Sequence, residues 1–167
     1  TRALRDVTNI HKGQYEASAV GEVNVVDKMK EINAIIGGEG NGGVIYPELH
    51  YGRDALIGVA LFLTQLAERK ISVRTLRDSY PNYFISKNKI ELTPEIDVDK
   101  ILSTLAKKYQ NEKITTIDGL KIDFKEGWGH LRKSNTEPII RIYAESDGDE
   151  KANAFAQNMI QEIKELL

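Results

Sequence analysis

The chain has 167 residues, a formal net charge of −2, 41% hydrophobic and 29% charged residues, and no cysteine. This length allows one sizeable domain or two small ones, and the composition is that of a folded globular protein. The weak net charge argues against nucleic acid as a partner, because its backbone requires many Lys and Arg on one face. The lack of cysteine excludes disulfides and suits a reducing cytoplasm, which is the expected location.

The first half of the chain predicts helices that alternate with short strands. Apolar residues at helical spacing indicate the helices, and short apolar runs bounded by glycine or proline indicate the strands. The longest apolar run, residues 55–63, is too short for the ~20 residues that span a bilayer, so no membrane partner is expected. The expected elements are helices at 4–11, 22–32 and 54–70, the last of them buried, a buried strand at 34–36 and an extended segment at 44–47.

The second half predicts an antiparallel sheet packed against helices, which makes the whole chain α/β plus α+β. Asp118-Gly119 is a strong hairpin signal, and the final helix carries a broad apolar stripe. The segment 79–81 is the expected linker, so the predicted domains are 1–79 and 80–167. The expected strands are 83–92, 113–117, 120–124, 128–132 and 138–145, with helices at 97–109 and 149–167.

A glycine run at residues 37–43 contains the letters G-x-G-x-x-G. A dinucleotide site would need a helix to open at the third glycine, whereas the extended segment 44–47 follows here. Glycines let a backbone approach a ligand closely, and Glu39 and Asn41 can both present oxygens to hydroxyl groups. The run therefore indicates a backbone conformation or close approach that requires glycine, but it does not identify a ligand. A flexible surface turn with a solvated Glu39 is the alternative.

The turn at residues 132–138 combines basic, hydroxyl and amide side chains between two extended runs. Arg132 offers a planar fork of N–H donors, and Ser134, Asn135 and Thr136 can surround the remaining oxygens of an anion. Charge-assisted hydrogen bonds contribute roughly 1.5–3 kcal/mol each, so three or four of them would hold a phosphate firmly. An ordinary polar hairpin turn is the alternative interpretation.

Three further features have ordinary structural explanations. His130 lies one strand period from Arg132 and should share its face, where a packing or surface role is the common outcome. Arg141, on the following strand, favours a cross-strand charge pair. The acidic residues at 147–149 imitate a divalent-metal loop, but Lys151 occupies the place of a third carboxylate. We therefore expect those acids to cap the last helix, and no metal site in this chain.

The glycine run and the Arg132 turn together resemble the α-D-phosphohexomutases, a family that includes phosphoglucomutase, phosphomannomutase and phosphoglucosamine mutase. The likeness rests on Gly-Glu-Gly-Asn-Gly at 38–42 and Arg-Lys-Ser-Asn-Thr-Glu-Pro at 132–138. Val-Gly-Glu at 20–22 and Gly-Arg-Asp-Ala at 52–55 extend it over essentially the whole chain. The second string is the more specific, and the two strings follow each other in the order found in the family.

The resemblance implies a fold for each half of the chain. Members of the family have four domains around a deep cleft. Residues 1–79 would form most of the third domain, a partial α/β/α layer with a mixed sheet. Residues 80–167 would form the fourth, a four- to five-stranded antiparallel sheet packed against two helices, like the TATA-box-binding protein.

The resemblance also implies an activity. The family moves a phosphoryl group between the C1 and C6 oxygens of a hexose, through a bisphosphorylated sugar. The loop that carries Glu39 and Asn41 would read sugar hydroxyls. The implied ligands of the phosphate that does not react are Arg132, Ser134, Asn135 and Thr136.

Two strings of the family are absent from this sequence, namely the Ser-His-Asn-Pro string of its phosphoserine and the Asp-Gly-Asp-x-Asp-Arg loop of its magnesium ion. The chain also opens on Thr1 without an initiator Met, which suggests a fragment. The expected partners are a glucose, mannose or glucosamine phosphate and the N-terminal domains of the same polypeptide, which would hold Mg²⁺. The fragment alone is expected to be inactive. The alternative is a non-catalytic regulatory module that binds phosphosugars.

Overall fold

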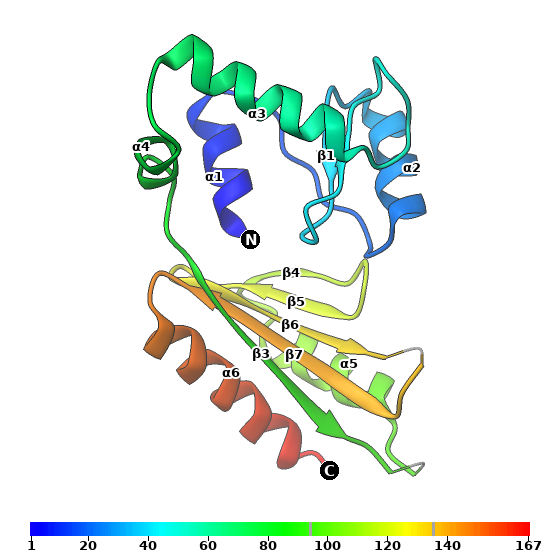
Figure 1. Ribbon diagram of the computed structural model, residues 1–167. Coiled ribbons are helices and arrows are strands. Elements are labelled where there is room, and N and C mark those ends of the chain that lie inside the picture. Colours follow the sequence, from blue (N-terminus) through cyan, green and yellow to red (C-terminus); the bar gives the residue numbers. More distant parts are fainter. Residues whose placement is uncertain (94, 135) are drawn as a thin grey trace. The chain divides into compact units, whose positions relative to one another are not determined.

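The computed structural model describes residues 1–93, 95–134 and 136–167. The chain divides into two compact units, one formed by Ala3–Pro81 and the other by Asn82–Leu167 with Thr1–Arg2. Up to Pro81 the elements are α1 (Arg2–Ile10), α2 (Glu22–Ile32), β1 (Gly37–Gly38), β2 (Val44–Ile45), α3 (Ala55–Arg69) and α4 (Val73–Asp78) (Figure 1). From Asn82 onward they are β3 (Phe84–Glu91), α5 (Val98–Lys108), β4 (Lys113–Thr115), β5 (Leu120–Asp123), β6 (Gly127–Lys133), β7 (Ile139–Ser146) and α6 (Asp149–Lys164).

The three longer helices predicted for the first unit are confirmed, and α3 has a side-chain cap at its start. The carboxylate of Asp54 caps α3 by accepting hydrogen bonds from the amides of Leu56 and Ile57, at 2.7 and 3.0 Å. The bond from Ile57 is the main reason that the pKa of Asp54 lies below its ordinary value. The cap fixes the first turn of α3 and with it the position of Arg53, the residue before the cap.

Two predictions for this unit are wrong. Residues 34–36 do not form a buried strand: β1 starts only at Gly37, and the side chain of Ile35 is 82% exposed. The helix α3 is not buried either, and Leu56 on it is 80% exposed. Among the described residues, this unit has only a two-stranded sheet with two residues in each strand, which offers little surface to cover an apolar helix. The short helix α4 was not predicted.

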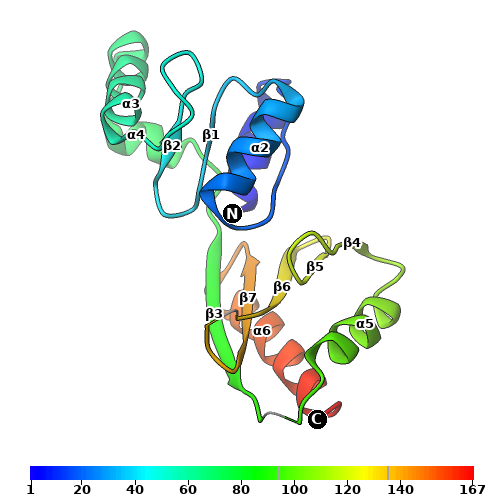
Figure 2. The same cartoon turned by 90° about the vertical axis from the view of Figure 1, so that its right-hand side faces the viewer.

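The second unit is the predicted antiparallel sheet, with five strands in the order β3-β7-β6-β5-β4 (Figure 1). Side chains alternate between its two faces, as strand geometry requires. On one face, Leu131 of β6 lies opposite Ile142 of β7, and both are fully buried. Helices α5 and α6 cover this face (Figure 2), and their residues Leu105 and Ile163 belong to the same core cluster. Each helix begins close to the residue that the sequence predicts.

The other face of this sheet carries polar and charged side chains. In β6, Trp128, His130 and Arg132 alternate with buried residues. Arg132 lies directly opposite Arg141 of β7. The register that buries Leu131 therefore places two guanidinium groups side by side on the open face, because a shift by one residue would exchange the faces of every side chain.

Replacing Leu131 by Ala tests how strongly this register depends on the core. Leu131→Ala should lower the free energy of unfolding by about 2–5 kcal/mol, because it removes a fully buried side chain and leaves a cavity. The control is Lys133→Ala, at an exposed position of the same strand, which should change stability by less than about 0.5 kcal/mol. Urea unfolding followed by circular dichroism measures both. Equal effects of the two substitutions would contradict this account of the core.

Candidate functional site

The glycine run forms the tight connection between β1 and β2. The amide of Glu39 donates to the carbonyl oxygen of Gly43 at 3.1 Å, and the amide of Gly42 donates to the carbonyl oxygen of Glu39 at 3.1 Å. Gly42 has φ +91°, a conformation that side chains strongly disfavour. A Cβ atom at Gly38 would lie 2.3 Å from the Gly43 oxygen. The backbone of this closed loop therefore needs glycine at these positions, as the composition of the run predicted.

Glu39 and Asn41, the two residues predicted to read hydroxyl groups, lie together in this loop. The side-chain amide of Asn41 donates to Glu39 Oε2 at 3.4 Å, and Asn41 Oδ1 accepts from the amide of Gly43 at 2.9 Å. The bond to Gly43 orients Asn41, so its amide nitrogen points toward the carboxylate. The pair offers oxygen acceptors on a rigid turn, an arrangement suited to hydroxyl or amino donors.

Two residues that were given no role in the sequence-based site complete this cluster. Arg53 Nε lies 2.9 Å from Glu22 Oε2, and the backbone amide of Arg53 donates to Glu22 Oε1 at 3.3 Å. Arg53 Nη1 lies 3.7 Å from Glu39 Oε2. Arg53 thus connects the start of α2 with the glycine loop. The strings at 20–22 and 52–55 were signals for these residues, but only the fold shows that they meet.

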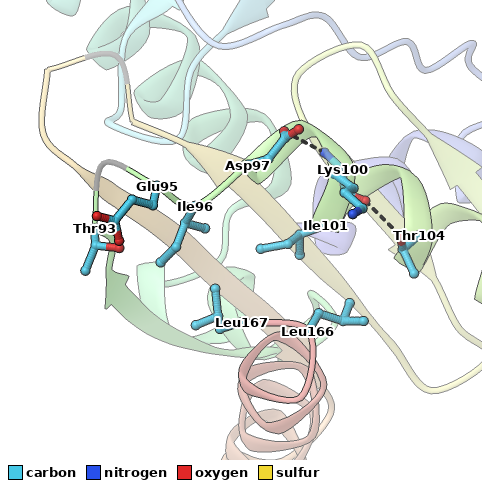
Figure 3. A pocket seen from close by; sticks show the side chains of 9 residues that line it. All are labelled: Thr93, Glu95, Ile96, Asp97, Lys100, Ile101, Thr104, Leu166 and Leu167. Atoms are coloured by element: carbon cyan, nitrogen blue, oxygen red, sulfur yellow. Dashed lines mark hydrogen bonds between the residues drawn. The ribbon is translucent and has the colours of Figure 1, made fainter.

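The cluster borders an open pocket of about 720 Å³. Glu22, Asn41 and Arg53 line it, together with the backbone of three glycines, Gly42, Gly43 and Gly52. A second pocket, of about 370 Å³, lies in the other unit between the start of α5 and the last residues of the chain (Figure 3). Ile96, Ile101 and Leu167 are among the residues that line this second pocket. None of the predicted site residues is among those that line it.

The predicted anion-binding residues occupy the end of β6 and the turn before β7. Ser134 Oγ lies 3.5 Å from Thr136 Oγ1 and accepts a hydrogen bond from the Thr136 amide at 3.4 Å. The backbone amide of Ser134 donates a hydrogen bond to the carbonyl oxygen of Ile139 at 3.0 Å, and this bond closes the turn. Asn135, the fourth predicted residue, lies outside the described residues.

Arg132 is held by Asp118, for which the sequence predicted only a role in a turn. Arg132 Nη1 lies 3.0 Å from Asp118 Oδ2, in the connection between β4 and β5. A guanidinium has five N–H donors, and this ion pair uses only one of them. The cross-strand charge pair predicted for Arg141 is wrong: its neighbours across the sheet are Arg132 and Lys89, and its acid partner is Glu137 in the turn, at 3.1 Å.

His130 shares the open face with Arg132, as the strand period predicts. Its Nε2 lies 2.5 Å from the backbone oxygen of Asp118, and because a carbonyl oxygen only accepts, Nε2 carries the proton. Burial lowers the pKa of His130 below its ordinary value of 6.5, more than the contact with Asp118 raises it. A neutral His130 therefore supports the same connection that holds Arg132.

The acidic residues before α6 do not form a metal site. Lys151 Nζ lies 2.9 Å from Asp147 Oδ1, and its hydrogen bond holds the pKa of Asp147 below the ordinary range. Gly148, and not an acid, is the N-cap of α6, without a side-chain bond; the expected side-chain cap is therefore wrong. Asp149 lies in the first turn, where its charge suits the helix dipole. Within the described ranges, no three His, Asp or Glu side chains are grouped to hold a metal ion, so these residues do not fit Mg²⁺.

Comparison with known proteins places both units in one family. Residues 1–83 match the family model of the phosphoglucomutase/phosphomannomutase alpha/beta/alpha domain III, and residues 89–162 match that of the phosphoglucomutase/phosphomannomutase C-terminal domain. The described fold, an α/β unit followed by an antiparallel α+β unit, agrees with both. The chain therefore belongs to the phosphoglucomutase/phosphomannomutase family, the α-D-phosphohexomutases.

Individual relatives agree with this assignment. The chain is 38% identical, over 92% of its length, to a phosphoglucosamine/phosphogalactosamine mutase of Sulfurisphaera tokodaii, and 36% identical, over 98%, to a phosphoglucomutase/phosphomannomutase of Thermococcus kodakarensis. A crystal structure of a family protein from Burkholderia thailandensis covers 98% of the chain with a TM-score of 0.76 and 25% identity. The chain spans only about a third of each relative, 33%, 36% and 35% respectively. None of the helices in the described ranges has the length and apolar character needed to cross a membrane.

Gly43→Ala tests the packing of Arg53 against the glycine loop. The added methyl would lie 2.7 Å from Arg53 Cδ and 3.2 Å from Asn41 Oδ1, so we expect a loss of about 1 kcal/mol in the free energy of unfolding of this unit. In an Arg53→Ala background the same substitution should cost clearly less, because the arginine stem is gone. Urea unfolding of the two single variants and the double variant gives the coupling between the sites. Strictly additive effects would contradict this contact.

The lowered pKa of His130 predicts a pH dependence of stability. The unfolded chain takes up a proton at this histidine before the folded chain does, so stability should be fully present above about pH 6.5 and fall as the pH drops through the lower, folded-state pKa. His130→Gln should flatten this part of the stability profile. Urea unfolding between about pH 8 and pH 5 measures the two slopes. Parallel profiles for the wild-type chain and the variant would show that His130 is not the group responsible.

Proposed function

We propose that this chain is the carboxy-terminal part of a phosphohexomutase, in which it orients the sugar and holds the phosphate that does not react. Residues 1–79 would then be most of the third domain and residues 80–167 the fourth. The whole enzyme would interconvert hexose 1-phosphate and hexose 6-phosphate through a bisphosphorylated intermediate. Its reacting serine and its Mg²⁺ would lie outside this chain, since the residues described here do not fit the ion.

The observation that supports the proposal is the short spacing of hydrogen-bond donors along residues 132–136. Arg132 belongs to the end of β6, and the hydroxyl groups of Ser134 and Thr136 lie close to each other in the turn that follows. Charge-assisted donors of this kind bind phosphate oxygens strongly. The family match supports a phosphosugar as the ligand over a free anion.

Arg141 strengthens the anion site. It lies directly opposite Arg132, and like charges in this position repel unless they are balanced. Asp118 and Glu137 supply one acid to each arginine, at 3.0 and 3.1 Å. Arg141 Nε is buried and has no hydrogen-bond partner among the described residues. A bound phosphate would relieve the remaining repulsion and provide an acceptor for such a donor.

Glu39 and Asn41 would bind the hydroxyl groups of the sugar. Phosphoryl transfer in this family requires the ring to bind in two orientations, so these residues should contact hydroxyl groups that occupy similar places in both. Such positioning contributes to catalysis by holding the reacting oxygen in line with the phosphorus atom. The chain contributes geometry and not the chemical step. Measured mutase turnover by this chain alone would contradict the proposal.

Arg132→Ala tests the phosphate site. We expect glucose 6-phosphate to shift the amide resonances of Ser134 and Thr136 in the wild-type chain, and the variant to bind at least about tenfold more weakly, because one charge-assisted bond contributes roughly 1.5–3 kcal/mol. The measurement is a titration followed by NMR. Lys133→Ala is the matched control, since it removes a cation from the next residue, whose exposed side chain belongs to the opposite face. Full response of both amides in Arg132→Ala would refute the assignment.

The alternative, a regulatory module that binds phosphosugars, predicts a different coding sequence upstream of Thr1. An in-frame Ser-His-Asn-Pro string and an Asp-Gly-Asp-x-Asp-Arg loop upstream of Thr1 favour the enzyme. A start codon shortly before Thr1 favours a module that binds phosphosugars without acting on them. Both alternatives use the same two loops, so binding to this chain cannot separate them but the upstream coding sequence can.

A further inference from the structure

The connection between β4 and β5 is fastened to β6 beside Arg132 by three separate contacts. Gly119 has φ +75°, and a Cβ atom there would lie 2.2 Å from the Leu131 backbone oxygen and 3.1 Å from Arg132 Cα. The ring of His130 donates a hydrogen bond to the backbone oxygen of Asp118 at 2.5 Å. The carboxylate of Asp118 meets the Arg132 guanidinium at 3.0 Å. The backbone of this connection is therefore held on β6 independently of the ion pair.

The ion pair itself is well enclosed, and its surroundings give it one direction. The side chains of Arg132 and Asp118 are only 26% and 27% exposed. Asp118 comes from the connection that leads into β5, whereas Arg141 lies on β7, the strand on the other side of β6. Attraction by Asp118 and repulsion by Arg141 therefore act on the Arg132 guanidinium in the same direction across the sheet.

An acid this close to an anion site acts on a bound phosphate in two opposite ways. Its negative charge repels the phosphate, although water and salt weaken this effect at a partly exposed site. Its bond to Arg132 fixes one N–H group of the guanidinium, so that the remaining donors have a defined direction. A free arginine side chain would have to lose its rotational freedom when the ligand binds. Removing the acid therefore weakens binding if orientation dominates and strengthens it if charge dominates.

We propose that Asp118 is a positioning residue that strengthens the binding of a phosphate monoester, despite its negative charge, because it holds the Arg132 guanidinium in the binding direction. The inference rests on the proposed function, in which Arg132 binds the phosphate that does not react. Asp118 touches neither the phosphate nor the sugar and acts through Arg132. A carboxylate can direct a guanidinium in this way only if it is itself fixed, and the contacts of Gly119 and His130 fix it.

The first test is Asp118→Asn, which removes the charge and keeps the shape of the side chain. Glucose 6-phosphate should bind the variant roughly threefold or more weakly than the wild-type chain. A titration of the complete chain, followed through the NMR amide signals of Ser134 and Thr136, measures both affinities. The charge control is Glu126→Gln, at an exposed acid in the turn before β6, which should change the affinity by less than about twofold. Equal or tighter binding by Asp118→Asn overturns the inference.

The second test repeats Asp118→Asn in an Arg132→Ala background. Arg132 is then no longer there to direct, and only the repulsion by Asp118 remains. Its removal should therefore raise the affinity for glucose 6-phosphate, by up to about twofold, where it lowered the affinity before. A substitution that merely loosened the connection would weaken binding in both backgrounds. That result would leave Asp118 a structural role and would overturn the inference.

A further variant separates position from charge without removing the acid. Asp118→Glu keeps the negative charge and moves the carboxylate by one methylene group, so it should also weaken binding by roughly threefold. An effect of charge alone predicts wild-type affinity for this variant, and that outcome contradicts the positioning role. The amide signals of Gly119 and Leu131 should stay near their wild-type positions in both Asp118 variants, because the backbone contacts of the connection remain.

Failure of the proposed function would look different. Glucose 6-phosphate would then leave the Ser134 and Thr136 signals of the folded wild-type chain unchanged, and the inference would fall with the phosphate site. If these signals respond in the wild-type chain and only the effect of Asp118→Asn has the opposite sign, the proposed function stands and the positioning role of Asp118 is wrong.

Discussion

The antiparallel pairing of β6 with β7 is the constraint on which the predicted anion-binding turn depends. Leu131 and Ile142 are partners in this pairing, and both are fully buried under the helices. Because side chains alternate along a strand, this burial forces Arg132 and Arg141 onto the other face, opposite each other. The hydrophobic core thus decides where the cations lie. A shift of either strand by one residue would place its guanidinium group under α5 and α6 at a large desolvation cost.

Both candidate sites hold their arginine with a carboxylate from a distant part of the chain. Arg132 is paired with Asp118, from the connection between β4 and β5, and Arg53 is paired with Glu22, at the start of α2. Such pairs on a partly hydrated surface add little stability by themselves. Their value is geometric, because a guanidinium held at one edge presents its remaining donors in a defined direction. The sites are therefore oriented before any ligand arrives.

The sequence allowed much of this fold to be predicted, because many of its signals are local. Helical spacing predicted α3 and α5, which the structure shows to be capped by Asp54 and Asp97, and the Asp118-Gly119 turn predicted the hairpin of β4 and β5. The failures came from features that depend on neighbours. The apolar residues at 34–36 predicted burial, but apolar character cannot show whether another element covers them. The same reason explains the exposed α3.

The site was predicted in part for the same reason. Glu39 and Asn41 lie in one turn, as do Ser134 and Thr136, so their proximity follows from short spacing. The contact of Arg53 with Glu22 joins residues 31 positions apart, and that of Arg132 with Asp118 joins residues 14 apart. Arg141 was expected to face an acid across the sheet, but its cross-strand neighbours are basic. Only the order and register of the strands determine such partners.

The two loops differ in their balance of charge. In the turn after β6, two arginines are balanced by two acids, one for each guanidinium. In the glycine loop, two acids share one arginine, and the Asn41 side-chain amide also donates to Glu39. Because the pairs in the turn join different strands and loops, their geometry depends on the register of the sheet, whereas the glycine loop is shaped largely by its own backbone bonds.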